Sequence, residues 1–259
     1  MSIILRKENK KATISKSYKV VSLLNYMEKI AEIIIATRLS YITETTNLFE
    51  INQIKDRKQK SAIDAIIILV HNIQLIKHEN KTTLVLFINI KEAYDHVLAN
   101  HLLKICQKLK LSKSLCFWIR LFFQNQKIQL KFDENIQEMT DINIDISQDS
   151  SVSPILFLIY IRFLLSERSN TSERVLSYVN DVDLVVSSKS IEENCQLLQK
   201  LAKDLLIDSK QNCMQFDVNK TELIHFHLKR SLDLKNELYL VKVEDTIFQS
   251  KELVKYLEI

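Results

Sequence analysis

The sequence predicts a mixed α+β fold, and three observations carry that prediction. Segments with apolar residues at helical spacing alternate along the chain with short runs rich in branched and aromatic residues, which favour strands. The 259 residues are 46% hydrophobic and 26% charged, values typical of a globular chain with a sizeable buried core. The chain has no internal repeat and no linker rich in Ser or Pro. These observations exclude a disordered or collagen-like chain.

The elements follow one another in a mixed order. Helical spacing predicts helices over 22–44, 61–77, 96–110, 112–123, 152–167 and 190–210. Alternation or continuous branched runs predict strands over 83–90, 127–133, 138–145, 174–179, 181–188 and 222–228, with two more within 237–247. Ser61 is a plausible N-cap, with Asp64 three residues further on, and Pro154 falls in a first helical turn. Asn180 and Asp181 separate two strands in the manner of a hairpin.

Glycine is absent from the chain. Average usage predicts about 18 glycines and about 13 prolines in a chain of this length, whereas the sequence has Gly 0 and Pro 1. Glycine takes a positive φ at little cost, so no fold benefits from losing every one. Because glycine, proline, alanine and many arginine codons are GC-rich, we interpret their joint depletion as the result of mutation.

Charge and cysteine content indicate the compartment and the class of partner. The net charge of +4 is mildly basic and compatible with nucleic acid binding. The apolar run over residues 152–165 is too short and too polar to span a bilayer, and the N-terminus lacks a signal peptide. The four cysteines are far apart and form no CxxC motif, which excludes a zinc ribbon and a disulfide framework. We therefore expect a protein of the cytoplasm or nucleus with no membrane partner.

Three segments stand out as carriers of chemistry. The predicted strand TLVLFINI runs into KEAYD, DISQDSSVSPILFLIY opens a long apolar helix, and YVND joins the strands of the predicted hairpin. In this order they resemble motifs A, B and C of reverse transcriptases, most closely those of non-LTR (LINE-type) retrotransposons. Flanking blocks agree: YKVVSLLN and NQIKDRKQKSAIDA precede motif A, and NKTELIHF and VKYLEI follow motif C. The resemblance covers residues 5–259.

The resemblance implies a polymerase right hand with fingers and palm, in which helices back an antiparallel palm sheet and the thumb is absent. We expect fingers over residues 1–82 and 106–146, and palm over 83–105 and 147–259. The implied activity is RNA-directed DNA synthesis from deoxynucleoside triphosphates, with an RNA template and a DNA primer as partners. In this family, carboxylates hold two Mg²⁺ ions that clamp the attacking 3′-hydroxyl and the leaving pyrophosphate.

The metal-ligand positions depart from the family pattern. Two of the family's three aspartates are Asn89 and Asn180 here, and Asp181 alone remains as a metal-binding carboxylate. An asparagine offers only a neutral oxygen, so two negative charges are missing where four positive charges must be held. The resemblance therefore implies that this copy is inactive. Acids at strand ends can also be solvated surface groups, and we prefer that interpretation for Asp183, which the family does not require.

Other positions match nucleotide-binding residues of the family. Motif B keeps Gln148 but has Asp149 where the family has a glycine, and a carboxylate there repels a triphosphate. Tyr94 matches the aromatic gate against a 2′-hydroxyl. Lys220 matches the lysine of motif D, which the family places at the catalytic centre.

A basic segment before motif A has two interpretations. Arg57 and Lys58 lie in a stretch that the resemblance identifies as the finger loop, where cations contact nucleotide phosphates. The alternative is an ordinary exposed loop with no ligand.

The same comparison locates the lost glycines. Against the family pattern, glycine is replaced at Lys55, Asp56, Glu92, Asp145, Asp149 and Glu258. Because Asp tolerates left-handed backbone better than Lys or Glu does, we expect Lys55, Glu92 and Glu258 to be the most strained.

Three functions remain open from the sequence. They are a weak polymerase, a non-catalytic nucleic-acid-binding remnant, and the product of a decayed element without function. The first needs another carboxylate to substitute at the metal site, and the second needs the basic finger loop.

Overall fold

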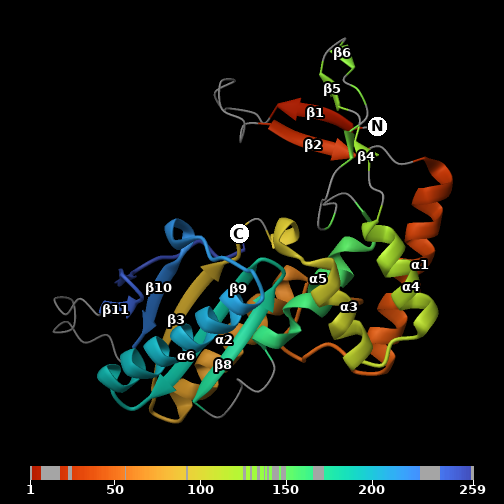
Figure 1. Ribbon diagram of the computed structural model, residues 1–259. Coiled ribbons are helices and arrows are strands. Elements are labelled where there is room, and N and C mark those ends of the chain that lie inside the picture. The colour runs from red at the N-terminus through yellow and green to blue at the C-terminus, as the bar shows by residue number, and fades with distance from the viewer. Residues whose placement is uncertain are drawn as a thin grey trace. The chain divides into compact units, whose positions relative to one another are not determined.

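The computed structural model describes residues 2–6, 18–22, 25–55, 57–91, 93–124, 127–128, 130–132, 135–136, 138, 140–141, 146, 150–165, 172–227 and 240–257. The chain forms two compact units, which we call the first unit (Met1–Ile42 and Tyr94–Ile159) and the second unit (Thr43–Ala93 and Tyr160–Ile259). Both contain helices and strands, which confirms the predicted α+β class (Figure 1).

The first unit combines small sheets with helices. One sheet has the strand order β2-β1-β5-β6, and β4 pairs with β7. The strands are β1 (Ser2–Arg6), β2 (Tyr18–Ser22), β4 (Lys127–Ile128), β5 (Leu130–Phe132), β6 (Asn135–Ile136) and β7 (Thr140–Asp141). The helical elements that lie in this unit, wholly or in part, are α1 (Tyr26–Thr45), η2 (Ala93–His96), α3 (Ala99–Lys108), α4 (Lys113–Phe123) and α5 (Ser153–Ile161). The sequence predicted neither β1 nor β2, and it began the first helix four residues too early.

The second unit is built on one six-stranded sheet of order β11-β12-β10-β3-β9-β8. Its strands are β3 (Thr82–Asn89), β8 (Glu173–Tyr178), β9 (Asp181–Ser188), β10 (Glu222–Phe226), β11 (Leu240–Val243) and β12 (Thr246–Lys251). Its helical elements are α2 (Ala62–His78), η3 (Arg162–Leu164), α6 (Ile191–Gln211) and η4 (Val218–Lys220). All neighbouring strands are antiparallel except β10 and β12, as expected for the palm of a polymerase.

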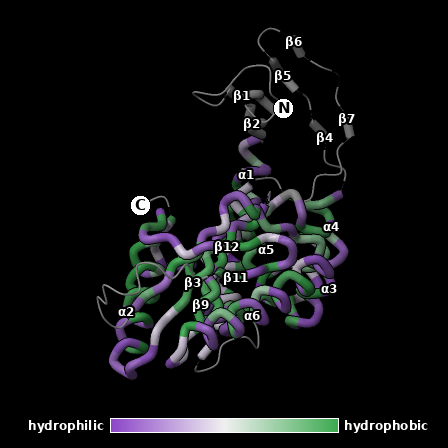
Figure 2. Tube along the Cα trace, turned by 90° about the vertical axis from the view of Figure 1, so that its left-hand side faces the viewer, coloured by the Kyte–Doolittle hydropathy of each residue, from purple (hydrophilic) through white to green (hydrophobic). Residues whose placement is uncertain are grey.

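Different helices cover the two faces of this sheet. Leu69 of α2 packs in a cluster with Val85, Leu176 and Val185, which the strand register places on one face. The opposite face lies against α6. On that face, Leu86 of β3 is fully buried. Hydrophobic residues therefore run along β3 and β9 in Figure 2. On the α2 face, the ends of β3 and β9 carry polar residues instead.

Residues 43–81 group with this sheet, although they were predicted as fingers. Backbone hydrogen bonds fix the loop before α2 on the edge strand β8, since Ile54 N–H donates to the Ser177 carbonyl and Ser177 N–H to the Asn52 carbonyl. The predicted cap of α2 is confirmed, because Ser61 and Asp64 form a reciprocal capping box. The division into fingers and palm thus stays a prediction whose bounds differ from those of the two compact units.

Helix ends show how a chain without glycine makes left-handed turns. Asn47, Asn80, Lys110 and Cys213 have φ between 51° and 58° and follow α1, α2, α3 and α6. In each case the next residue donates its N–H to a carbonyl five residues earlier, as Met214 does to Ser209 at 2.8 Å. This is the Schellman motif, whose left-handed position glycine usually occupies. Lys55, expected to be strained, is not among the residues with positive φ, so that expectation is wrong, and the other five replaced glycines lie outside the described residues.

Restoring glycine at these helix ends should stabilise the fold. A non-glycine residue at positive φ costs about 1–2 kcal/mol, and glycine returns about 0.5–1 kcal/mol of that as unfolded-state entropy. We expect Lys110→Gly and Cys213→Gly each to raise the free energy of unfolding by up to about 1 kcal/mol, measured by urea denaturation. The matched control is Lys55→Gly, which should bring no gain. Equal effects at Lys55 and Lys110 would contradict the assignment.

The helices that the structure describes include none that is both long enough and apolar enough to cross a membrane.

Candidate active site

The site lies where β3 ends and the β8–β9 hairpin turns. Asn89 is the last residue of β3 and stands opposite Asp181, the first residue of β9. The N–H of Ile90 donates to the carbonyl of Asn180 at 2.7 Å, which fixes the turn against the end of β3. The structure thus brings together the three positions at which the family pattern has aspartates.

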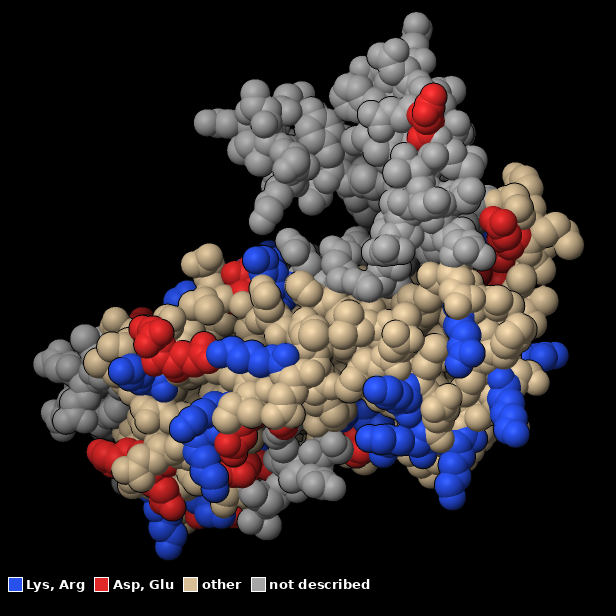
Figure 3. All heavy atoms as spheres, viewed as in Figure 1, with Lys and Arg blue, Asp and Glu red and all other residues tan. Residues whose placement is uncertain are grey.

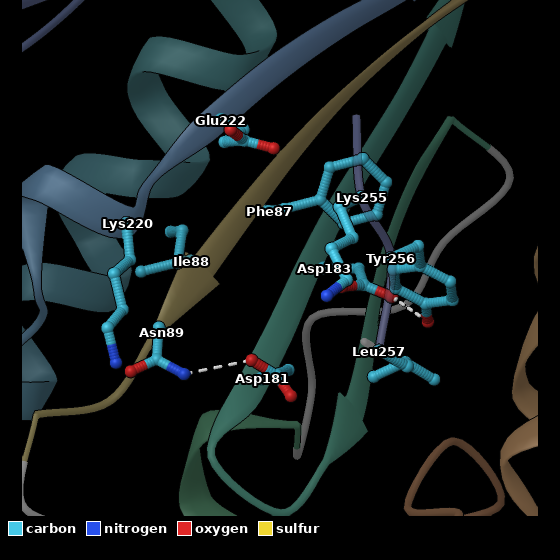
Figure 4. A pocket seen from close by; sticks show the side chains of 10 residues that line it. All are labelled: Phe87, Ile88, Asn89, Asp181, Asp183, Lys220, Glu222, Lys255, Tyr256 and Leu257. Carbon is cyan, nitrogen blue, oxygen red and sulfur yellow. Dashed lines mark hydrogen bonds between the residues drawn. The ribbon is translucent and has the colours of Figure 1, made fainter. Parts of the chain in front are cut away.

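The contacts of these side chains differ from those of a cluster of carboxylates. The amide nitrogen of Asn89 donates a hydrogen bond to Oδ1 of Asp181 at 2.9 Å (Figure 4). The reverse amide orientation would set two oxygens against each other, so the electrostatics favour the orientation that is seen. Oδ1 of Asn180 is buried, and no donor reaches it from any residue the structure describes.

The hairpin turn is strained. Val179 has φ 58° and is only 5% exposed. A branched residue in the left-handed region is a genuine outlier, and such outliers cluster at functional sites. The turn therefore holds Asn180 and Asp181 in a conformation that the local sequence disfavours.

A small hollow opens beside these residues, with a volume of about 60 Å³. It is lined by Phe87, Ile88, Asn89, Asp181, Asp183, Lys220, Glu222, Lys255, Tyr256 and Leu257. In Figure 4 the ammonium group of Lys220 points toward the side chain of Asn89. Ligand pockets usually measure about 300–1,000 Å³, so this hollow is too small to enclose a ligand of ordinary size.

Asp183 is buried below the hollow. It lies two residues after Asp181 on the same face of β9, and its side chain is 2% exposed. The hydroxyl of Tyr256 donates to its Oδ2 at 2.5 Å, and the Tyr256 ring lies 5.0 Å from that of Phe87. Burial raises the pKa of Asp183 to about 7, the Tyr256 hydrogen bond opposes this shift, and the charge of Asp181 adds to it. The interpretation of Asp183 as a solvated acid is therefore wrong.

Removing the Tyr256 hydroxyl should destabilise the second unit. Oδ1 of Asp183 already lacks a partner among the described residues, and Tyr256→Phe leaves the other oxygen unsatisfied too. We expect Tyr256→Phe to lower the free energy of unfolding by about 2 kcal/mol, measured by urea denaturation at pH 8. Tyr26→Phe is the control, since Tyr26 is 87% exposed. Adding Asp183→Leu to Tyr256→Phe should recover part of the loss because it removes the buried carboxyl. An unchanged stability for Tyr256→Phe would show that the hydrogen bond contributes nothing.

The residues present do not fit a two-metal centre. Asp181 is the one carboxylate at the family's metal positions, and its Oδ1 already accepts the hydrogen bond from Asn89. Within the described ranges, no three His, Cys, Asp or Glu side chains are placed to hold a metal ion. A single negative charge cannot balance two Mg²⁺ ions, so we derive no catalytic step through bound metal.

The predicted nucleotide-binding residues fall in different places. Arg57 pairs with Glu44 through two hydrogen bonds of 2.9 and 2.7 Å and also donates to the carbonyls of Glu50 and Gln53. These contacts fix the loop, whereas the neighbouring Lys58 is exposed. A nucleotide-binding role for both stays a prediction.

Two further predictions concern motifs A and B. Tyr94 belongs to the first unit, where its ring lies 5.2 Å from that of Phe157. Gln148 and Asp149 lie outside the described residues. The sequence missed Tyr256 and Lys255 as lining residues, although the block VKYLEI that contains them was recognised.

Comparisons with known proteins identify the family of this chain. The profile of the reverse transcriptase (RNA-dependent DNA polymerase) family matches residues 5–258. The probable RNA-directed DNA polymerase from transposon BS of Drosophila melanogaster is 21% identical over 262 residues, a match that covers 99% of this chain and 28% of that protein. The chain thus spans less than a third of this relative.

Solved structures show the same fold. Apo telomerase from Candida tropicalis superposes with a TM-score of 0.54 at 14% identity, covering 75% of this chain and 35% of that one. Telomerase from Candida albicans, in complex with a TWJ fragment of telomeric RNA, superposes with a TM-score of 0.53 at 14% identity. This match covers 85% of this chain and 38% of that one. With a family profile that spans nearly its whole length, this chain belongs to the reverse transcriptase family.

Proposed function

We propose that this chain is the RNA-directed DNA polymerase domain of a retrotransposon-type protein, and that its own metal centre no longer supports nucleotide transfer. The observation that carries the proposal is the meeting of Asn89, Asn180 and Asp181 at the ends of β3 and the β8–β9 turn. By the family pattern, this meeting point corresponds to a polymerase metal site that has lost two of its charges. Members of this family use divalent metal ions, and we propose Mg²⁺ as the ion of the ancestral centre.

The remaining residues support substrates of the same class. Lys220 lines the hollow beside Asp181 and points toward Asn89 (Figure 4). A lysine ammonium there suits the phosphates of a deoxynucleoside triphosphate. An RNA template and a DNA primer complete the proposed set of partners.

The alternative is a non-catalytic nucleic-acid-binding remnant, and the loop before α2 favours it. Lys55, Lys58 and Lys60 are exposed on this loop. The ammonium group of Lys55 lies 5.1 Å from the ring centroid of Tyr178, which directly precedes the hairpin turn. Cations therefore lie beside the candidate site, where phosphates of a bound nucleic acid are expected under either proposal.

Binding of an RNA–DNA primer–template hybrid tests both proposals without requiring activity. We expect fluorescence anisotropy to show an affinity that falls steeply with KCl, by about 0.7–0.9 in the log–log slope for each phosphate contact. Lys58→Gln with Lys60→Gln should flatten that slope by roughly 1.5 by the same figure. Lys200→Gln with Lys203→Gln, two exposed changes on α6, is the control. If the affinity for the hybrid does not change with salt, a nucleic-acid-binding function is rejected. The remaining hypothesis is then the product of a decayed element without function.

A further inference from the structure

An acid-free cationic segment lies outside the candidate site. Residues 96–132 contain no Asp or Glu. Their cations are Lys104, Lys108, Lys110, Lys113, Arg120, Lys127 and Lys131. The first five lie on α3, on α4 and in the turn between them, and all five are exposed. By contrast, α6 carries both lysines and acids.

The two helices direct these charges to solvent together. Lys104 and Lys108 are one turn apart on α3, away from its buried residues such as Leu102. Lys110 and Lys113 bracket the turn, where Lys110 has φ 56°. Since α3 packs against α4, the charges form one surface. Figure 3 shows Lys and Arg side chains gathered over these helices.

An exposed aromatic ring lies among the cations. Phe117 is 60% exposed, and it follows Lys113 by one turn and precedes Arg120 by another on α4. The opposite side of α4 packs inward through Ile119, which is fully buried. An aromatic ring between cations, on a helix whose apolar side is already covered, is an arrangement that binds a stacked base and its phosphates.

In the described part of the chain, no acidic side chain pairs with the cations of this surface. Like charges one turn apart repel each other, which costs stability unless an anion is bound. The positive charge also affects His101. Its pKa is lowered mainly by partial burial and, to a smaller extent, by the charges of Lys104 and Lys108. The surface is therefore electrostatically suited to a polyanion.

We propose that the exposed faces of α3 and α4 form a second nucleic-acid surface, which binds single-stranded nucleic acid by its phosphates and stacks a base on Phe117. The choice of nucleic acid as partner rests on the proposed function, since a polymerase domain must hold strand that is not yet paired. The lysines act as point charges and read no sequence. Apart from Phe117, the one large apolar side chain exposed on α4 is Leu121, which is too little to bury in a lipid surface.

Binding of labelled 20-nucleotide oligo(U) to the full chain tests the proposal. The patch variant carries Lys104→Gln, Lys108→Gln, Lys110→Gln and Lys113→Gln. Its control carries Lys189→Gln, Lys200→Gln, Lys203→Gln and Lys242→Gln, which remove the same charge from exposed positions of the second unit. At 100 mM KCl we expect the patch variant to bind at least tenfold more weakly, with a log–log salt slope flatter by roughly 2.8 for four phosphate contacts. The control should change less than twofold.

A second variant separates stacking from charge. Phe117→Ala should weaken oligo(U) binding about tenfold and leave the salt slope unchanged. Oligo(dT), a blunt RNA duplex and phosphatidylserine vesicles serve as other ligands. Comparable binding of oligo(dT) supports the proposal, because phosphates and stacking do not select the sugar. The proposal would be overturned if the patch variant lost more affinity for the duplex or for the vesicles than for single strands.

The outcomes distinguish this proposal from the proposed function. If the hybrid binds with a steep salt slope while the patch and control variants bind oligo(U) equally, the second surface is rejected and the polymerase domain stands. If neither hybrid nor single strand binds, both are rejected. Circular dichroism and urea denaturation of each variant confirm that it is folded before binding is compared.

Discussion

The purified protein is expected to add no deoxynucleotides to a primed homopolymer RNA, with either Mg²⁺ or Mn²⁺. By the family pattern, we expect Asn89 and Asn180 to stand where two metal-binding carboxylates belong, and the amide of Asn89 donates a hydrogen bond to Oδ1 of Asp181. Losing this charge should raise the barrier by at least about 4 kcal/mol, a rate loss of roughly a thousandfold. Extension of a labelled primer, resolved on a denaturing gel, measures the loss. Robust extension that Asp181→Ala abolishes would show that one carboxylate suffices.

Restoring the carboxylates should recover only part of the activity. Asn89→Asp with Asn180→Asp returns two charges to a geometry that is already in place, so extension should rise by several orders of magnitude above the unmodified chain. Asp149 remains, and from the family pattern we expect its carboxylate to repel the nucleotide triphosphate. We expect adding Asp149→Gly to lower the KM for the nucleotide by about tenfold, which corresponds to about 1.4 kcal/mol.

A matched change separates charge from shape at this position. Asp149→Asn in the restored background keeps the size of the side chain and removes its charge, so it should give most of the gain in KM. Full activity from the two asparagine changes alone would show that Asp149 does not impede the nucleotide.

The meeting of Asn89, Asn180 and Asp181 could be predicted from the sequence because the three residues belong to local patterns. Asn89 ends a strand that its own run of branched and aromatic residues specifies, and Asn180 and Asp181 form a turn between two such strands. Pairing these strands then brings the three residues together. The alternation of β9 also placed Asp183 on the face of Asp181, yet it said nothing about burial.

Burial and long-range pairing were not predictable in this way. The bond between Asp183 and Tyr256 joins residues 73 positions apart, and no local spacing records it. The strand β1 was missed for the same reason, because it pairs with β2 and, in parallel, with β5. Backbone strain was wrongly predicted at Lys55. A family motif shows where a glycine stands in the sequence, but it does not show whether the φ of that position is positive.

We expect the hydrogen bond from Asn89 to Asp181 to join the ends of β3 and β9 without help from a bound cation. In a metal-dependent polymerase, neighbouring carboxylates repel one another until a metal ion binds. This repulsion lowers the stability of the fold at a functional site. Here the amide of Asn89 donates to Asp181 in place of an ion, and we expect the exchange that lowers catalysis to relieve that repulsion as well. A gene released from selection for activity can therefore drift toward a more stable fold at its former centre. Asn89→Asp would reverse this drift, so the restored site should be less stable in EDTA and regain stability when Mn²⁺ is added.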